Sequence, residues 1–403
     1  MKKNNGSPDS IIVMKFGGTS VRSEESRAHA IKHIRSHADS GKQVVVVVSA
    51  MGRKGEPYAT DTLISLLKDL GEPVNPAELD SVMSIGEILS STYFSHLLSQ
   101  NGLPAQAFTG SLAGILTDDN PGNAEILGIN PSRIRSALNA GKIAVVAGFQ
   151  GATAEGDVRT LGRGGSDTSA VALASALKAE KVEIYSDVDG IANCDPRQIS
   201  EADFMDAVSA SQILSMANEG SKVIHPRAIK AALQTQTTIV ARNTFSNAPG
   251  TTIFHGTAAE DSIQVALAHR DEMSLIEFEA ETDADKLVPE MIRVDEHRFV
   301  LKNDVYLESR VKELQNKYGA LRKENGWATI SVVFDKSAPE SISPPETEII
   351  PSSKNVICYL LKEDFLTSSL RTLYGHYISA CLLYTSDAAD EGLGVDLGGR
   401  RII

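Results

Sequence analysis

The sequence has little cysteine. Its 403 residues include three cysteines, at positions 194, 358 and 381, and no Cys-x-x-Cys pair. An odd number of cysteines at such wide spacing argues against a disulfide framework and against a thiolate metal site. We therefore expect reduced thiols and a cytoplasmic location.

The sequence also has no long apolar run. No stretch approaches the roughly 20 apolar residues that a membrane-spanning helix needs. The N-terminal residues Met1–Ser10 carry Lys, Asn and Asp without the apolar centre of a signal peptide. We therefore expect no membrane partner.

Basic residues are in deficit. Lys and Arg together number 39 against 52 Asp and Glu, which gives a formal net charge of -13 at pH 7. This balance disfavours a general nucleic-acid-binding surface, although it is compatible with a local basic site for an anionic ligand. We expect no nucleic-acid partner.

The familiar nucleotide-binding motifs are missing too. Neither Gly41-Lys42-Gln43 nor Gly141-Lys142-Ile143 has the Ser or Thr that follows the lysine of a P-loop. A dinucleotide fingerprint that began at Gly162 would place its third glycine at Asp167. Any nucleotide must therefore be held in another way.

What the sequence does contain is a regular alternation of short β-rich runs and helical segments. The composition is 42% hydrophobic and 23% charged, as in ordinary globular proteins, and the length suggests two or three domains. The run Val44–Val48 is typical of a strand buried on both faces of a parallel sheet. Between residues 11 and 255 the alternation predicts an α/β domain with a mainly parallel sheet.

A glycine-rich stretch precedes an alanine-rich helical run, in Gly162-Arg163-Gly164-Gly165-Ser166-Asp167. Backbone N–H groups at such a helix start can converge on an anion, as in a phosphate-transfer loop. The alternative is a plain strand-to-helix connection. Beyond it, the short strand Val182–Tyr185 ends before Ser186 and Asp187, and strand ends are where open α/β sheets bind ligands.

A second glycine loop follows the first predicted strand, in Lys15-Phe16-Gly17-Gly18-Thr19-Ser20. A glycine pair lets the backbone approach phosphate oxygens, and the strand-end lysine supplies a mobile charge for them. The alternative is a buried strand that ends in a solvated lysine.

Glu87 interrupts the apolar pattern of a helix that we expect between Asp80 and Leu98. It is either a buried functional carboxylate or an acid of the first helical turn, where the helix dipole favours negative charge. The sequence by itself leaves both interpretations open.

Together these motifs resemble the aspartate kinase branch of the amino-acid kinase family. The segment Met51–Asp61 further resembles the bacterial subgroup that includes diaminopimelate-sensitive isoenzymes. The resemblance covers roughly residues 11 to 255 and weakens afterwards. The motifs that carry it occur in family order and at family-like spacing: Lys15 to Val21, Val47 to Gly52, Ala147 to Gly151, Gly162 to Asp167, Ser186 to Gly190, and Asp195-Pro196-Arg197.

The resemblance implies transfer of the γ-phosphoryl group of ATP to the side-chain carboxylate of L-aspartate, which gives 4-phospho-L-aspartate. This reaction is the first step of lysine, threonine, methionine and diaminopimelate biosynthesis. The implied cofactors are ATP and Mg2+, with the metal carried by ATP. A carboxylate is already ionised at pH 7, so the site needs no general base. It must instead bring two anions together and spread the charge of the transferring group.

The resemblance also implies a role for each matching residue. The catalytic residues are Lys15, Asp167 and Lys222, with Asp167 holding Lys15 in position. Glu87 is expected on the α-amino group of aspartate and Arg163 on its α-carboxylate. The full substrate-binding set is Ser49, Thr60, Glu87, Arg163, Gly164, Gly165 and Ser166. The ATP-binding set is Lys15, Phe16, Gly17, Gly18, Ser20, Ser186, Asp187, Ala192, Arg197 and Lys222.

One position departs from the family pattern. Many members carry a tyrosine near the nucleotide after an Asp-Gly pair, and this chain has Ala192 there. The change either lowers adenine affinity or leaves space that another apolar group fills. We expect His225 to be a structural helix-start residue, because Pro226 suits the first position of a helix.

The resemblance implies an amino-acid-kinase-like α/β sandwich with a mainly parallel central sheet, followed by a smaller α+β ACT-like (ferredoxin-like) regulatory region. We expect a disordered N-terminus at 1–10, a catalytic domain at 11–258, an incomplete regulatory region at 259–380 and a non-native tail at 381–403. Such regulatory modules imply a homodimer and an amino-acid effector, namely lysine, threonine or diaminopimelate. The sequence does not identify the effector, because the expected effector loop is not recognisable around residues 289–296.

Two other functions stay open. The chain could be another member of the superfamily that phosphorylates glutamate, acetylglutamate or a nucleotide. It could also be a regulatory subunit that binds ligands without turnover, although the intact Lys15, Glu87, Arg163 and Asp167 count against this.

Overall fold

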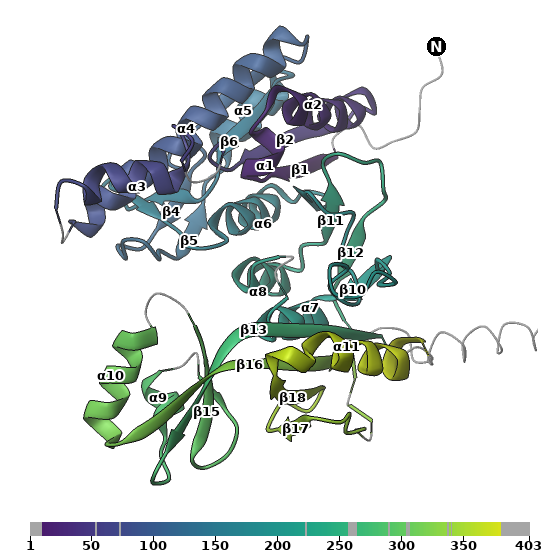
Figure 1. Cartoon of the computed structure of the whole chain (residues 1–403). Coiled ribbons are helices and arrows are strands. Elements are labelled where there is room, and N and C mark those ends of the chain that lie inside the picture. Colours follow the sequence, from purple (N-terminus) through teal and green to yellow (C-terminus); the bar gives the residue numbers. More distant parts are fainter. Residues whose placement is uncertain are drawn as a thin grey trace, which may run out of the picture. The chain divides into compact units, whose positions relative to one another are not determined.

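The computed structural model describes residues 10–52, 55–71, 74–221, 224–256, 264–288, 291–303, 307–336, 338–339 and 341–379 (Figure 1). Lys222 and the segment expected to be a tail, 381–403, lie outside these residues, as do residues 1–9. The chain divides into two compact units. The first comprises Met1–Ile191, Phe204–Ala217 and Lys222–Gly256, and the second comprises Ala192–Asp203, Asn218–Ser221 and Thr257–Ile403.

The first unit is built on an eight-stranded sheet with the order β10-β12-β11-β9-β1-β2-β6-β3. Only the pair β11 and β12 is antiparallel, so the prediction of an α/β domain with a mainly parallel sheet is confirmed. The strands are β1 (Ile11–Phe16), β2 (Gln43–Val48), β3 (Ala105–Phe108), β6 (Ile143–Ala147), β9 (Val182–Ser186), β10 (Ala207–Ser209), β11 (Ile239–Asn243) and β12 (Thr251–Phe254).

Strand β1 lies at the centre of this sheet, between β2 and β9, and is parallel to both. Its residues alternate between the two faces. Phe16 belongs to an apolar cluster with Ile34 of α2 and Phe94 of α4, on the face that these helices cover. Lys15 therefore points to the opposite face, where α6 packs against β1.

The helices of the first unit begin where the sequence offers capping groups. Ser23 accepts a hydrogen bond from Ser26 N–H at the start of α2, and Asn75 accepts one from Ala77 N–H at the start of α4. Pro226 opens α8, as predicted. The helices are α1 (Gly18–Val21), α2 (Glu24–Asp39), α3 (Thr60–Lys68), α4 (Pro76–Gln100), α5 (Ser132–Asn139), α6 (Gly165–Leu177), α7 (Ala210–Asn218) and α8 (Pro226–Thr235).

A smaller four-stranded sheet, of order β5-β4-β7-β8, belongs to the same unit. Its strands are β4 (Ile115–Thr117), β5 (Ile126–Ile129), β7 (Gln150–Ala152) and β8 (Val158–Thr160). The polar, turn-rich segment from Thr117 to Ala124 connects β4 to β5, and Ala124 N–H donates to the carbonyl of Thr160 at 2.9 Å.

The end of the first unit adds two strands to the sheet. Residues Ala207–Ser209 form β10, which pairs with β12 and buries Val208 completely, and α7 begins directly after it at Ala210. Strand β11 is followed by β12, which pairs with it antiparallel.

The second unit contains a six-stranded sheet of order β14-β15-β13-β16-β18-β17, and every pair in it is antiparallel. Its strands are β13 (Val265–Phe278), β14 (Ile292–Arg293), β15 (Arg298–Lys302), β16 (Leu321–Phe334), β17 (Thr347–Ile350) and β18 (Val356–Lys362). The helical segments are α9 (Ala284–Leu287), α10 (Leu307–Tyr318), the 3-10 turn Glu363–Phe365, α11 (Leu366–Tyr374) and the π-helical turn Gly375–Ser379.

Strands β13 and β16 run through two separate apolar cores of this unit. At one end, the two strands pack with α10 around Phe299 and Leu314. At the other end, they pack with α11 around Tyr359 and Leu370. Strand β17 lies at the edge of this sheet and pairs antiparallel with β18. The arrangement agrees with the expected α+β ACT-like region.

Among the residues that the structure describes, no helix is both long and apolar enough to cross a bilayer.

Candidate functional site

A cleft of about 270 Å³ lies in the first unit, where β1 and β2 end and α6 begins. Carboxyl ends of neighbouring parallel strands meet at one edge of a sheet, which is where open α/β sheets bind ligands. Nine of the predicted site residues line the cleft, together with Phe149 and Gly162. They are Lys15, Ser49, Thr60, Glu87, Arg163, Gly164, Gly165, Ser166 and Asp167.

Lys15 and Asp167 form an ion pair in this cleft, with Nζ and Oδ1 2.7 Å apart. Both side chains are largely buried, at 12% and 14% exposed. Asp167 stands in the first turn of α6, where the helix dipole favours a carboxylate. The contact holds the ammonium group in the cleft lining, and the organising role of Asp167 stays a prediction.

Glu87 is buried in the middle of α4, so the interpretation as a first-turn acid was wrong. Its Oε1 accepts a hydrogen bond from the Ala50 N–H at 3.0 Å. Gly86 permits this approach, because a β-carbon there would lie 2.7 Å from the β-carbon of Ala50. Burial raises the pKa of Glu87 to about 7, against the pull of the Ala50 N–H and of Lys15. The carboxyl group is therefore poised to gain or lose a proton near neutral pH.

The second oxygen of Glu87, Oε2, is buried and has no hydrogen-bond partner among the described residues. An unpaired buried carboxylate oxygen carries a desolvation cost that a bound cation would relieve. Because Glu87 lines the cleft, this oxygen is suited to accept from an ammonium group of a ligand.

The glycine loop before α6 places backbone N–H groups at the cleft. Gly162 and Gly164 both have a φ of 71°, a left-handed conformation that glycine adopts readily. Gly164 is the N-cap of α6 and has no side-chain capping bond. The Gly165 N–H donates to the Gly162 carbonyl at 3.0 Å, so the N–H of Ser166 is the one that an anion at this helix start could accept from.

His225 is the N-cap residue of α8, and its Nδ1 accepts a hydrogen bond from the Arg227 N–H at 3.3 Å. This confirms the prediction of a helix-start residue. Burial lowers the pKa of His225, although Asp167 opposes the shift, so the ring is neutral at pH 7. His225 packs closely against Gly164, because a β-carbon added to Gly164 would lie 2.3 Å from the β-carbon of His225.

Several residues expected at the nucleotide lie outside the cleft lining, near the ends of β1 and β9. The ring of Phe16 is buried and stacks on Tyr185, and the Ser20 hydroxyl is buried 2.7 Å from that of Thr244. Neither side chain is open to solvent. Gly18 allows a close backbone approach, since a β-carbon there would lie 2.9 Å from the Ala50 carbonyl. Also in the first unit but outside the lining are Gly17, Ser186 and Asp187.

Two further predicted ATP residues, Ala192 and Arg197, belong to the second unit. Arg197 forms an ion pair with Asp195 at 2.6 Å, within its own turn. Lys222 lies outside the described residues. The roles assigned to these three residues stay predictions.

Phe149 and Gly162 were missed as lining residues, although each lies inside a motif that carried the family resemblance. Phe149 has a φ of 70°, which is uncommon for a residue with a side chain. Its N–H donates to the hydroxyl of Ser169 at 3.1 Å, which ties the end of β6 to α6. Nothing in the local sequence indicates this conformation.

No cluster of three or more His, Cys, Asp or Glu side chains suited to a metal ion occurs within the described part of the chain.

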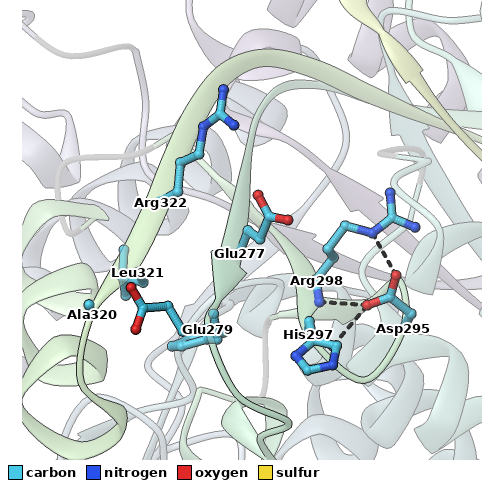
Figure 2. A pocket seen from close by; sticks show the side chains of 9 residues that line it. Glu277, Glu279, Asp295, His297, Arg298, Ala320, Leu321 and Arg322 are labelled. Carbon is cyan, nitrogen blue, oxygen red and sulfur yellow. Dashed lines mark hydrogen bonds and ion pairs between the residues drawn. The ribbon is translucent and has the colours of Figure 1, made fainter.

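The second unit has a cavity of its own, of about 600 Å³ (Figure 2). The carboxylates of Glu277 and Glu279 and the guanidinium of Arg322 lie around it. Asp295 and Arg298 form an ion pair at 2.6 Å on the other side. The cavity thus offers charges of both signs.

Comparison with known proteins identifies the family. The sequence matches the amino acid kinase family over residues 10–243, more than half of the chain. The chain therefore belongs to the amino acid kinase family.

Curated relatives carry the name aspartokinase. The chain is 48% identical over 243 residues to aspartokinase 1 of Bacillus subtilis (strain 168), a match that covers 60% of each protein. It is 41% identical over 267 residues to the aspartokinase of Geobacillus stearothermophilus, across 66% of this chain and 64% of that protein. The chain thus matches less than two thirds of the length of these relatives. The resemblance to aspartate kinases is confirmed, and the diaminopimelate-sensitive subgroup stays a prediction.

Solved structures show the same fold. E. coli aspartokinase III in complex with aspartate and ADP matches 91% of this chain and 100% of its own, with a TM-score of 0.71 and 23% identity. The aspartate kinase from Synechocystis matches 90% of this chain and 69% of its own, with a TM-score of 0.55 and 28% identity. The expected kinase-like sandwich followed by an ACT-like region is therefore confirmed as the fold.

The packing behind the glycine loop predicts a difference between two substitutions. Gly164 and Gly141 have the same φ of 71°, but a β-carbon at Gly141 would meet nothing within 4 Å. We expect Gly141→Ala to lower the free energy of unfolding by about 1 kcal/mol, from backbone strain alone. Gly164→Ala should cost about 2 to 4 kcal/mol, because strain adds to the collision with His225. Urea denaturation measures both, and equal losses would contradict this packing.

Proposed function

We propose that this protein is an aspartate kinase, which transfers the γ-phosphoryl group of ATP to the side-chain carboxylate of L-aspartate. The product is 4-phospho-L-aspartate, the first intermediate on the way to lysine, threonine, methionine and diaminopimelate. The observation that carries the proposal is the convergence of Lys15, Glu87, Arg163 and Asp167 on one cleft. The names of the curated relatives support it.

The substrate-binding roles follow from the charges in the cleft. Arg163 would hold the α-carboxylate of aspartate with a bidentate fork of N–H donors. Glu87 would accept from the α-ammonium group through its unpaired Oε2. The hydroxyls of Ser49, Thr60 and Ser166 line the same cleft and can hydrogen-bond the side-chain carboxylate.

The chemical step needs electrostatic stabilisation more than proton transfer. The attacking carboxylate of aspartate is ionised at pH 7, so no base must activate it. Lys15, fixed by Asp167 at 2.7 Å, would neutralise charge that develops on the transferring group. The Ser166 N–H at the start of α6 would do the same without any reorganisation.

Magnesium would enter with ATP and neutralise charge on its β- and γ-phosphate oxygens. The cleft is compatible with a metal ion that arrives with ATP, because the carboxylate of Asp167 is already paired with Lys15 and does not have to bind the metal. The nucleotide would be held by the ends of β1 and β9, near Gly17, Gly18, Ser186 and Asp187.

Two alternatives remain to be separated by experiment. A related kinase would prefer glutamate, acetylglutamate or a nucleotide as acceptor, and a regulatory subunit would bind ATP without turnover. A coupled assay with Mg-ATP across these acceptors decides between them, and aspartate must be the best.

Removal of the Arg163 guanidinium tests the substrate assignment. We expect Arg163→Ala to raise the aspartate KM far more than the ATP KM, because only the substrate loses a charged bidentate contact. The loss in kcat/KM for aspartate should correspond to about 2 to 4 kcal/mol. Arg133→Ala, which removes an exposed arginine of α5, is the matched control and should leave both KM values unchanged. Equal effects of Arg163→Ala on the two substrates would rule out the assignment.

The pKa of Glu87 predicts how aspartate affinity depends on pH. The carboxyl must be ionised to bind an ammonium group, and with a pKa of about 7 only about a tenth is ionised at pH 6. Aspartate should therefore bind about tenfold more weakly at pH 6 than at pH 8, with proton release on binding. Calorimetry in two buffers of different ionisation enthalpy measures this.

The change Glu87→Gln should weaken binding and abolish its rise between pH 6 and pH 8. Glu125→Gln, at an exposed position, serves as the control and should keep the wild-type profile. A wild-type affinity that is constant over this range would exclude Glu87 as the ammonium partner.

The second unit supports a regulatory role. We propose that residues 259–380 form an ACT-like regulatory region after a catalytic domain at 11–258, and that the chain forms a homodimer through it. The cavity near Glu277 and Arg322 offers charges of both signs, which suit the ammonium and carboxylate of a free amino acid. Lysine, threonine and diaminopimelate are the candidate effectors. One E. coli aspartokinase III structure is itself a complex with lysine and aspartate.

Effector binding and mass in solution test this role. We expect a dimer by light scattering, and calorimetric binding of one of the three amino acids. Glu277→Gln should weaken that binding at least tenfold, because it removes a charge at the cavity. Glu313→Gln, at an exposed position on α10 that does not line the cavity, should not. A monomer, or a wild-type protein that binds none of the three, would refute the proposal.

A further inference from the structure

The loop that carries Arg163 cannot fix its own conformation. Both neighbours of Arg163 are glycines with a φ of 71°, and glycine loses more conformational freedom on folding than any other residue. The Gly165 N–H donates to the Gly162 carbonyl at 3.0 Å and closes the turn around Arg163. Contacts made from outside the loop can therefore restrict its conformation further.

Arg227 supplies such contacts from the first turn of α8. Its guanidinium donates to the carbonyl of Leu161, the residue directly before the loop. It also donates to the Ala124 carbonyl at 2.6 Å and to Oδ1 of Asn123 at 2.9 Å. A planar guanidinium presents its donors in a fixed fork, so one side chain holds two chain segments in one geometry.

Asp80 of α4 binds the same 120–124 segment that Arg227 contacts. Asp80 is fully buried and accepts from the Gly122 N–H at 2.9 Å. It also accepts from the N–H of Thr160 at 3.2 Å and from its hydroxyl at 2.5 Å. These bonds fix the 120–124 turn against the end of β8.

Asp80 and Glu87 lie on the same buried face of α4. They are seven residues apart, which is two helical turns or about 10 Å along the axis. Ser84, between them, accepts at its carbonyl from the Gln150 side chain at 2.9 Å. A continuous set of hydrogen bonds thus runs from the helix that carries Glu87, through the 120–124 turn, to the loop that carries Arg163.

We propose that Arg227 is a positioning residue of the active site. Through the Leu161 carbonyl and the turn held by Asp80, it sets the direction of Arg163 and its separation from Glu87. That separation selects substrates with an ammonium and a carboxylate on the same carbon atom, which is the chemical class of α-amino acids. The inference rests on the proposed function, which assigns Glu87 and Arg163 to these two groups.

Kinetics of the full-length protein test the inference. Arg227→Ala should lower kcat/KM for aspartate about 10- to 100-fold, mainly through KM, because small displacements of a binding group have effects of this size. The ATP KM should change less than about threefold. Arg227→Lys should be intermediate, since its ammonium keeps the charge and some donors but not the fork.

A double substitution separates positioning from general loss of structure. If Arg227 acts through Arg163, adding Arg227→Ala to Arg163→Ala should change kcat/KM for aspartate by less than about threefold. Effects that multiply independently would overturn the inference. If Arg163→Ala has no aspartate-selective effect while Arg227→Ala does, the substrate assignment fails and the link from Arg227 to Arg163 fails with it.

Arg135 offers a matched control. Its guanidinium also donates to backbone carbonyls, those of Ala176 and Leu177 at the other end of α6. Arg135→Ala should cost comparable stability in urea denaturation but leave the aspartate KM within about twofold of wild type. An equal rise in KM for Arg135→Ala would show that loss of stability alone explains the result.

Amide hydrogen exchange tests the geometry without any substrate. Arg227→Ala should speed exchange of the amides from residue 162 to 166 at least tenfold, whereas Arg135→Ala should not. Unchanged exchange in this loop would overturn the inference whatever the acceptor of the kinase is. Faster exchange in the loop, with glutamate or another acceptor preferred over aspartate, would keep the positioning role and reject the proposed function.

Discussion

The parallel pairing of β1 with β2 and β9 is the constraint on which the cleft depends. In a parallel sheet the carboxyl ends of neighbouring strands lie at one edge, so Lys15 and Ser49 reach the same place from segments more than thirty residues apart. The side-chain alternation of β1 then directs Phe16 into the core and Lys15 toward α6. Register and alternation together decide which groups meet the ligand.

The charges of the cleft balance two needs. The proposed reaction requires a site that attracts two anions, yet unpaired buried charges are costly. Lys15 is paired with Asp167, and burial raises the pKa of Glu87 to about 7, so this carboxyl group is only partly ionised near neutral pH. Arg163 and the start of α6 at Ser166 line the same cleft and offer donors suited to an anion.

The glycines that open the cleft also make it dependent on distant residues. The backbone around Gly162 and Gly164 comes close to the ligand site because it has no side chains, and for the same reason it has few contacts of its own. Arg227 and His225 supply the missing support from α8. Hydrogen bonds from α8 to backbone carbonyls therefore restrict a segment that its glycines leave flexible.

The sequence by itself determined the local elements and the inventory of charged and glycine residues, since strand runs, capping residues and glycine loops depend on near neighbours. The helix start at Pro226 and the buried strand at Val44–Val48 could be predicted in this way, and the resemblance to aspartate kinases named most of the cleft residues. Tertiary structure decided what those elements do together. Contacts between segments tens of residues apart set three features of the site. These are the burial and raised pKa of Glu87, the left-handed backbone of Phe149 and the hydrogen bond from Arg227 to the Leu161 carbonyl. Local propensity carries no information on such contacts, because they form only when the whole sheet closes.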